Sequence, residues 1–398
     1  MNIEYAKRVS GAKPSIIREI LKQMNDPTLI SFAGGNPAPE SFPIKEIRRF
    51  SDECLRDDPV GTLQYSLTEG YTPLRQSTAD FINRKWTVKK ETDDLIITSG
   101  SQQAIDFLSK ILCNEGDVVL CEEASYVGAL NAIRSYGVKT LGVPNDETGT
   151  MDMQALEKAL AASPKPKFLY VIPNFQNPMG TTLPAEKRAK IYELAVRCGV
   201  PVFEDNPYGD LRYSGEALPP IKSLDTEGAV VYAASFSKIF CPGMRISALV
   251  ADKGLMARLV VAKQCGDVHS NVWSQKVCDR MLRECDMDGH IARLQAIYRE
   301  KSALMLREMD KHFSRRTRYT RPEGGMFIWV TLPDEVDMLQ LVDAALKEKV
   351  AVVPGSAFSP DEEETSHCFR MNFSTPSNDN IIKGVEILGR LTKRFCGE

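Results

Sequence analysis

Seven short apolar runs recur between residues 95 and 250 of this chain, and amphipathic segments of helical length separate them. The runs occupy residues 95–99, 118–121, 140–143, 168–172, 200–204, 229–234 and 246–250. Short apolar runs rich in β-branched residues are typical of strands buried on both faces, and helical spacers favour parallel crossover connections. We therefore predict an α/β fold: an open, mostly parallel, seven-stranded sheet with helices on both faces.

The alternation stops after residue 275, which predicts a second structural unit. Residues 290–313 have the apolar spacing of one long helix, and shorter strand and helix patterns follow it. Because 398 residues exceed the size of one ordinary core, we expect a smaller α+β domain here. The predicted division is an N-terminal segment 1–40, which packs with the small domain and carries a lid helix, a large domain 41–288 and a small C-terminal domain 289–398.

Charge and composition argue against several classes of partner. Lysine plus arginine number 50 and aspartate plus glutamate 53, so the net charge of −3 offers no basic field for nucleic acid. We find no export signal and no apolar segment of bilayer length in the sequence, and the 10 cysteines contain no Cys-x-x-Cys pair. The 4 histidines lack metal-ligand spacing. We expect a cytoplasmic protein with no membrane, nucleic-acid or metal partner.

Lys238 lies just after the apolar run 229–234, where the carboxyl end of a buried strand opens into a loop. A lysine amine in a partly dry site loses its proton at moderate cost and can form a Schiff base with an aldehyde. The hydroxyls of Ser235 and Ser237 and the guanidinium of Arg245 suit a phosphate. An aldehyde and a phosphate on one small molecule describe pyridoxal 5′-phosphate. Taken alone, Lys238 is equally compatible with a solvated loop.

Three other strand ends carry polar residues. Residues 99–104 form a glycine turn that enters a helix, which favours an anion site, although Ser101 also suits a simple helix cap. Asn177 follows the run 168–172, where it could equally stabilise a turn. Asp205 and Tyr208 follow the run 200–204. A carboxylate at the end of an apolar strand needs a cationic partner, and a protonated pyridine nitrogen is one.

Taken in order, these segments resemble the class I/II aminotransferases, which are pyridoxal-phosphate enzymes of fold type I. The resemblance is carried by residues 31–35, 63–66, 99–104, Asn177-Pro178-x-Gly180, the Lys238 segment and Arg370. Residues 15–22 and 319–326 are most similar to the 2-aminoadipate, kynurenine and aromatic aminotransferase branch. The implied activity moves an amino group from an L-amino acid of 2-aminoadipate, aromatic, branched or glutamate type to a 2-oxo acid, with 2-oxoglutarate as the expected acceptor.

The resemblance also implies how the cofactor is held. Lys238 would form the Schiff base and move the proton between the substrate α-carbon and the cofactor. Asp205 would keep the pyridine nitrogen protonated, and Tyr126 would stack on the ring. Asn177 and Tyr208 would bond the phenolic oxygen. The residues implied for the phosphate are Ser101, Gln102, Ser235, Ser237 and Arg245.

Substrate recognition and assembly follow from the same resemblance. Arg370 would pair with the substrate α-carboxylate, assisted by Asn177 and the backbone of Gly35. Tyr65 would reach the phosphate of the neighbouring subunit, which implies a homodimer with shared active sites. Arg18 lies on a short helix rich in isoleucine, so it could meet a distal carboxylate of the substrate. The alternative for Arg18 is a solvated arginine with no effect on substrate choice.

Two other functions would use the same cofactor-binding residues. One is another fold type I reaction, such as that of a β-lyase or a decarboxylase. The other is the pyridoxal-phosphate-binding module of a transcription regulator, which follows a DNA-binding domain. Few residues precede the helix at Ser15, so we do not expect a regulator.

Overall fold

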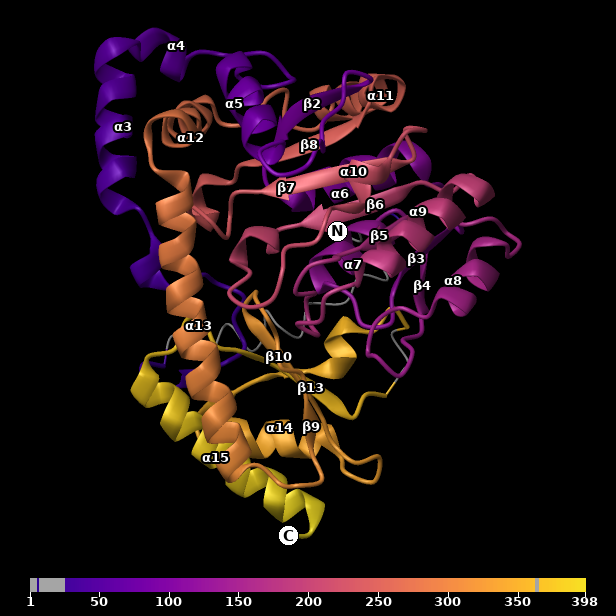
Figure 1. The fold of residues 1–398 in the computed structure, drawn as a ribbon, viewed down its shortest axis with the longest axis vertical. Helices are drawn as coiled ribbons and strands as arrows, with labels where there is room; N and C mark the ends of the chain where they lie inside the picture. Colours follow the sequence, from indigo (N-terminus) through magenta and orange to yellow (C-terminus); the bar gives the residue numbers. More distant parts are fainter. Residues whose placement is uncertain (1–5, 7–25, 362–364) are drawn as a thin grey trace, which may run out of the picture.

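A seven-stranded sheet forms the upper part of the computed structural model, which describes residue 6, residues 26–361 and residues 365–398 (Figure 1). Its strands are β2 (Asp93–Thr98), β3 (Val118–Glu122), β4 (Lys139–Val143), β5 (Leu169–Val171), β6 (Val202–Asn206), β7 (Val230–Ser235) and β8 (Ser247–Asp252). Their order is β2-β8-β7-β6-β5-β3-β4, and β8 alone runs antiparallel to its neighbours in this sheet. The predicted mostly parallel sheet of seven strands is confirmed.

The middle of this sheet is buried on both faces, because successive side chains of β3, β5 and β6 enter opposite hydrophobic clusters. Val119 and Cys121 of β3 join one cluster, whereas Val118 and Leu120 join the other. The first face is covered by α6 (Ser101–Leu112), α7 (Val127–Arg134) and α11 (Lys253–Gln264), and the second by α8 (Met153–Leu160), α9 (Ala185–Cys198) and α10 (Ile221–Leu224). The helices expected on both faces are therefore present.

A second, antiparallel sheet lies in the lower part of Figure 1, with the order β12-β13-β10-β9. Its strands are β9 (Arg318–Tyr319), β10 (Phe327–Thr331), β12 (Val353–Pro354) and β13 (Cys368–Asn372). Beside it, β1 (Ile30–Ser31) pairs in parallel with β11 (Val350–Ala351), so an early segment of the chain joins a late one. The domain boundaries given above stay a prediction.

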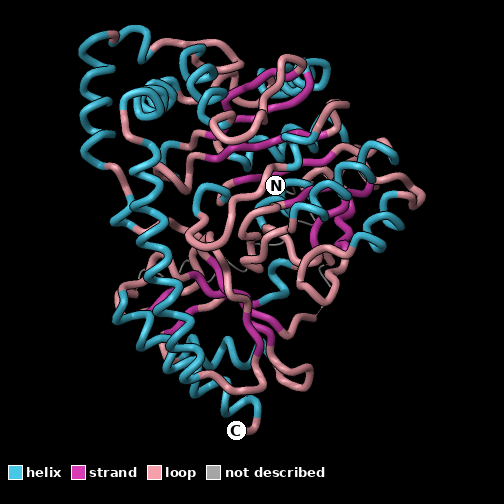
Figure 2. The backbone as a smooth tube through the Cα atoms, viewed as in Figure 1, coloured by secondary structure: helices cyan, strands magenta, loops and turns pink. Residues whose placement is uncertain are grey.

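The helix α13 (Met287–His312) runs past both sheets and packs along α15 (Asn378–Cys396) (Figure 1). It begins where the Asp286 carboxylate accepts a hydrogen bond from the backbone N–H of Gly289, a typical helix N-cap. The remaining elements, visible with the others in Figure 2, are η2 (Pro39–Ser41), α3 (Ile44–Asp57), α4 (Pro59–Leu63), α5 (Thr72–Ile82), η3 (Gly209–Leu211), η4 (Pro242–Met244), α12 (Val272–Glu284), α14 (Met338–Lys347) and η5 (Gly355–Phe358). In the part of the chain that the structure describes, no helix is long and apolar enough to cross a membrane.

Candidate active site

A cavity of about 400 Å³ opens at the carboxyl ends of β5, β6 and β7, beside the first turn of α6. The carboxyl ends of parallel strands are the usual place for a ligand in an open α/β sheet. Of the predicted site residues that the structure describes, all but Tyr65 line this cavity. They are Gly35, Ser101, Gln102, Tyr126, Asn177, Asp205, Tyr208, Ser235, Ser237, Lys238, Arg245 and Arg370.

Lys238 lies in the turn that follows β7, and its side chain is partly buried. The Nζ atom donates a hydrogen bond to the carbonyl of Gly35 at 2.7 Å. Burial lowers the pKa of Lys238 to about 8, and the cations of Arg370 and Arg245 act in the same direction. The amine is still mostly protonated at pH 7, but it loses its proton more readily than an exposed lysine does, as a nucleophile or a proton acceptor must.

Asp205, on β6, is buried, and its two oxygens have different surroundings. Oδ2 accepts a hydrogen bond of 2.9 Å from the phenol of Tyr170, whereas Oδ1 has no hydrogen-bond partner among the described residues. Burial raises the pKa of Asp205 to about 6, and the bond from Tyr170, the nearby Ser101 hydroxyl and the charge of Lys238 oppose this rise. Sequence reasoning missed Tyr170. Its only signal was a phenol inside the apolar run 168–172, where a buried hydroxyl needs a partner.

The first turn of α6 faces the Arg245 side chain. The Arg245 Nη2 atom donates to the carbonyl of Ser99 at 3.0 Å, and a Cβ built on Gly100 would lie 2.3 Å from the same nitrogen. Gly100 also has a φ of +79°, which side chains rarely adopt. The Ser101 Oγ atom is buried without a partner in the described chain. Free helix N–H groups, a hydroxyl and a guanidinium together suit a phosphate.

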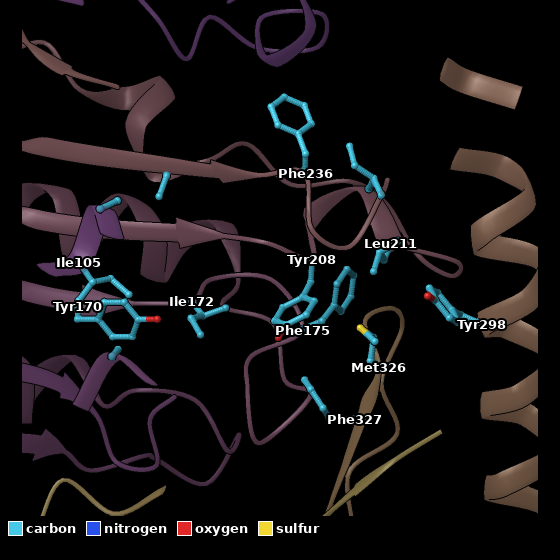
Figure 3. Packing of buried hydrophobic residues seen from close by; sticks show 14 of the residues in the cluster. Ile105, Tyr170, Ile172, Phe175, Tyr208, Leu211, Phe236, Tyr298, Met326 and Phe327 are labelled. Atoms are coloured by element: carbon cyan, nitrogen blue, oxygen red, sulfur yellow. The ribbon is translucent and has the colours of Figure 1, made fainter. Parts of the chain in front are cut away.

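Aromatic rings form the walls of the cavity. The Tyr126 hydroxyl lies 3.4 Å from Gln102 Oε1, and Gln102 Nε2 donates to the carbonyl of Gly128 at 2.6 Å. Tyr208 packs edge-on against Phe327, with ring centroids 5.8 Å apart. Figure 3 shows Tyr208 among the core side chains that connect the seven-stranded sheet with the start of β10. Burial raises the pKa of both phenols, so both remain neutral hydrogen-bonding groups.

Arg370, on β13, brings the second sheet to the cavity. It is buried, and its guanidinium lies over the ring of Phe327 at 4.4 Å. Nη1 donates to the side chain of Asn177 at 2.7 Å and Nη2 to the carbonyl of Ala33 at 2.6 Å. Its Nε atom is buried and, within the described residues, unpartnered. Burial lowers the pKa of Arg370 to about 10, which still leaves it a cation at neutral pH. A buried guanidinium of this kind suits a carboxylate.

One predicted residue, Tyr65, is not brought to this cavity. Tyr65 is 83% exposed, and its ring packs edge-on against that of His269 at 5.7 Å. Arg18 lies outside the described residues. Conversely, several residues that the sequence did not single out line the cavity: Asn36, Val127, Gly128, Asn131, Ile172, Pro207 and Pro242. Three of them, Asn36, Val127 and Pro207, adjoin a predicted residue in sequence.

The side chains present fit pyridoxal 5′-phosphate. The unpartnered oxygen of Asp205 is an acceptor for a protonated ring nitrogen, and Ser101 Oγ is a donor beside a helix N-terminus. The Lys238 amine lies in the same cavity as both. The set thus supplies an amine for an aldehyde, a carboxylate for a pyridinium and donors for a phosphate.

Comparison with known proteins identifies the family of this chain. The family model described as aminotransferase class I and II matches residues 28–388. Aromatic-amino-acid aminotransferase 1 of Thermococcus litoralis is 36% identical over 98% of this chain and 94% of its own length.

Two solved structures have the same fold. The kynurenine aminotransferase of Pyrococcus horikoshii, solved in complex with PMP, has a TM-score of 0.93 and 36% identity, covering 98% of this chain and 97% of its own. The alpha-aminoadipate aminotransferase of Thermus thermophilus, complexed with N-(5′-phosphopyridoxyl)-L-leucine, has a TM-score of 0.90 and 37% identity, covering 99% and 98%.

Proposed function

This chain belongs to the class I and II aminotransferases and uses pyridoxal 5′-phosphate. We propose that it transfers the amino group of several L-amino acids to 2-oxoglutarate. The donors are 2-aminoadipate, glutamate, and aromatic and branched amino acids. One observation carries the assignment of the active site: the amine of Lys238, the carboxylate of Asp205 and the guanidinium of Arg370 line one cavity of about 400 Å³.

Lys238 holds the cofactor and carries the proton. When bound, pyridoxal 5′-phosphate supplies the electron sink that amino-acid side chains lack. The lowered pKa of Lys238 lets its Nζ atom take the α-proton of the substrate and give it up again near neutral pH. Asp205 Oδ1 accepts the hydrogen bond of the ring nitrogen, and the bond from Tyr170 to Oδ2 orients the carboxylate.

The remaining cavity residues bind and orient the cofactor and the substrate. The first turn of α6, with Ser101 and Gln102, holds the phosphate together with Ser235, Ser237 and Arg245. Tyr126 covers the ring, while Asn177 and Tyr208 bond its phenolic oxygen. Arg370 binds the α-carboxylate of the substrate, assisted by Asn177 and by the Gly35 backbone, which orients the α-carbon toward Lys238.

Substrate breadth is supported by the relatives. Their names include aromatic-amino-acid, kynurenine and alpha-aminoadipate aminotransferases, and one was solved with a phosphopyridoxyl-leucine compound. Arg18 is the residue we propose for a distal substrate carboxylate. Because each of these relatives is an aminotransferase, transamination is preferred over the β-lyase and decarboxylase alternatives.

A homodimer with shared sites is part of this proposal. Tyr65 is exposed within its own chain, as a residue that serves a neighbouring subunit must be. Four other large apolar residues close to it in sequence or beside its contact with His269 are also exposed: Val60, Leu63, Leu67 and Val268. Clustered exposure of this kind is typical of an interaction surface. The cytoplasmic location stays a prediction.

Product analysis of the purified holoenzyme tests the proposed function. Each donor is incubated with 2-oxoglutarate and, in parallel, with pyruvate or oxaloacetate. We expect every donor class to give its 2-oxo acid, with 2-oxoglutarate as the fastest acceptor. Release of ammonia or carbon dioxide in place of amino transfer would overturn it. Borohydride reduction followed by peptide mapping should place the pyridoxyl label on Lys238, and a label on another lysine would reject the site assignment.

A further inference from the structure

The turn that carries Lys238 makes contacts both on the side that faces the cavity and on the opposite side. At its start, the N–H of Phe236 donates to the carbonyl of Ile246 at 3.2 Å, and within the turn Phe240 N–H donates to Phe236 at 2.8 Å. Lys238 extends to the Gly35 carbonyl on the cavity side. Behind it, the rings of Phe236 and Phe240 stack with centroids 5.5 Å apart.

His290, near the start of α13, contacts the end of this turn. Its Nε2 atom lies 2.5 Å from the carbonyl oxygen of Ile239, the residue next to Lys238. Its Nδ1 atom lies 3.0 Å from Nη2 of Arg293. A guanidinium only donates hydrogen bonds, so Nδ1 must accept. The proton of the neutral ring is therefore on Nε2, which donates to Ile239.

The surroundings of His290 stabilise this arrangement. Burial lowers the pKa of His290, and the charge of Arg293 acts in the same direction, so the ring stays neutral near pH 7. The ring lies 6.2 Å from that of Phe240, which extends the aromatic stack behind the turn. Ile239 itself is buried. A buried carbonyl that loses its donor keeps the cost of desolvation without compensation.

We infer that His290 is a positioning residue for the reaction: by holding the Ile239 carbonyl, it fixes the turn that aims the Lys238 amine. The inference rests on the proposed role of Lys238 as proton carrier. Proton transfer is sensitive to displacements of about 1 Å, whereas substrate binding through Arg370 does not pass through this turn. Loss of the contact should therefore lower kcat more than it changes KM.

The test compares His290→Leu with His290→Gln in the holoenzyme, with His312→Leu as control. Glutamine keeps a donor near the Nε2 position, and His312 lies at the opposite end of the same helix, beside Glu308. We expect His290→Leu to lower kcat about 10- to 100-fold with less than about a threefold change in KM. His290→Gln should recover most of the kcat, and His312→Leu should resemble the wild type.

Hydrogen–deuterium exchange of peptides covering residues 236–241 supplies a readout apart from activity. Faster exchange there in His290→Leu, but not in His290→Gln or His312→Leu, supports the inference. A kcat within twofold of wild type, equal kcat losses in the leucine and glutamine variants, or unchanged exchange in the leucine variant would overturn it. A borohydride label on a lysine other than Lys238 would instead reject the proposed role of Lys238, and the exchange result would then test the contact of His290 with the turn by itself.

Discussion

At the scale of single residues, the two oxygens of the Asp205 carboxylate differ in their hydrogen bonding. Oδ2 is taken up by Tyr170, and Oδ1 is left without a partner in the described structure. Burial alone would favour the protonated acid, and the phenol limits that effect by stabilising the charged form. Tyr170 thus helps Asp205 to remain an anion at the pH where Lys238 is partly unprotonated.

Replacing Tyr170 with phenylalanine should move the acid limb of the activity profile to higher pH. The bond from Tyr170 lowers the pKa of Asp205, so its loss raises that pKa and fewer molecules carry the carboxylate at a given pH. A hydrogen bond to a charged group contributes about 1.5 kcal/mol or more, which corresponds to a shift of about one pH unit. The measurement is kcat/KM between pH 5 and pH 9.

Tyr136→Phe is the matched control for this change. Its phenol also donates to a carboxylate at 2.9 Å, that of Asp106, away from the cavity. We expect the control to keep the wild-type profile. An unshifted acid limb in Tyr170→Phe, or an equal shift in both variants, would contradict the role given to Tyr170.

Two kinds of signal predicted the cavity residues: a polar residue at the end of an apolar strand, and, for Gly35, Gln102, Tyr126 and Arg370, the family resemblance alone. Lys238 and Asp205 follow the strand-end rule directly. Tyr170 does not follow this rule, because it lies inside β5. Its contact with Asp205 depends on the parallel register of β5 and β6, which places Tyr170 opposite Phe203, two residues before Asp205. His290 was missed for the same reason, since its partner Ile239 is distant in sequence.

At the scale of elements, the first turn of α6 depends on a residue that has no side chain. A Cβ on Gly100 would collide with Arg245, and its φ of +79° is unfavourable for alanine. Gly100→Ala should therefore weaken pyridoxal 5′-phosphate binding, raising Kd about tenfold or more, since about 1.4 kcal/mol corresponds to a factor of ten. Fluorescence titration of the apoenzyme measures this Kd.

Gly116→Ala is a control that separates the effect of a positive φ from the effect of the close approach to Arg245. Gly116 has a similar φ of +88°, but no atom lies within 4 Å of its added Cβ. Its substitution should lower the melting temperature while leaving the cofactor Kd unchanged. If Gly100→Ala binds the cofactor as tightly as Gly116→Ala does, the turn is not a phosphate site.

The end of β3 carries a buried acid whose ionisation should lower stability. Glu122 accepts hydrogen bonds from the Ile172 N–H and the Gln176 side chain, and burial raises its pKa from 4.5 to about 8. The folded protein thus retains a proton that the unfolded chain has released. The free energy of unfolding should fall by roughly 1 to 3 kcal/mol between pH 5 and pH 8 on account of this group.

Glu122→Gln should remove that part of the pH dependence, because an amide accepts the same bonds and does not ionise. Denaturant midpoints at pH 5.5 and pH 8 measure it. Glu123→Gln, at the exposed neighbouring position, is the control and should keep the wild-type dependence. Identical pH dependence in all three proteins would show that Glu122 does not titrate with folding.

The order of the elements was harder to predict than their existence. All seven runs form strands, and this includes the edge strand β4, although its Leu141 is 52% exposed. Nothing in the run 246–250 signals that β8 lies between β2 and β7 and runs antiparallel to both. The two-residue strands β1 and β11 are too short for any periodic pattern, so their pairing depends on tertiary structure alone.

At the scale of the whole molecule, mixed dimers test whether two subunits share each site. Tyr65→Ala and Lys238→Ala should each be nearly inactive alone. After subunits are exchanged in a 1:1 mixture, a mixed dimer has one site with Lys238 from one chain and Tyr65 from the other. Half of the dimers are mixed and each has one intact site, so we expect activity near a quarter of wild type.

Mixing Lys238→Ala with Asp205→Ala is the matched control, because both residues belong to the site of one chain. No mixed dimer of that kind contains an intact site, and no activity should return. Recovery in both mixtures, or in neither, would rule out a shared site, as would wild-type activity of Tyr65→Ala alone.

The pairing of β1 with β11 cannot form until long after β1 has been synthesised. Ile30 pairs with Val350, so roughly 320 residues separate the partners along the chain. Ribosomes add about 5 to 20 residues per second, and the second strand is therefore made roughly 15 to 60 seconds after the first. All seven strands of the large sheet lie between Asp93 and Asp252 and are synthesised within that interval. During synthesis, β1 must therefore wait for β11 before Phe32 can donate its N–H to Ala351 and become buried.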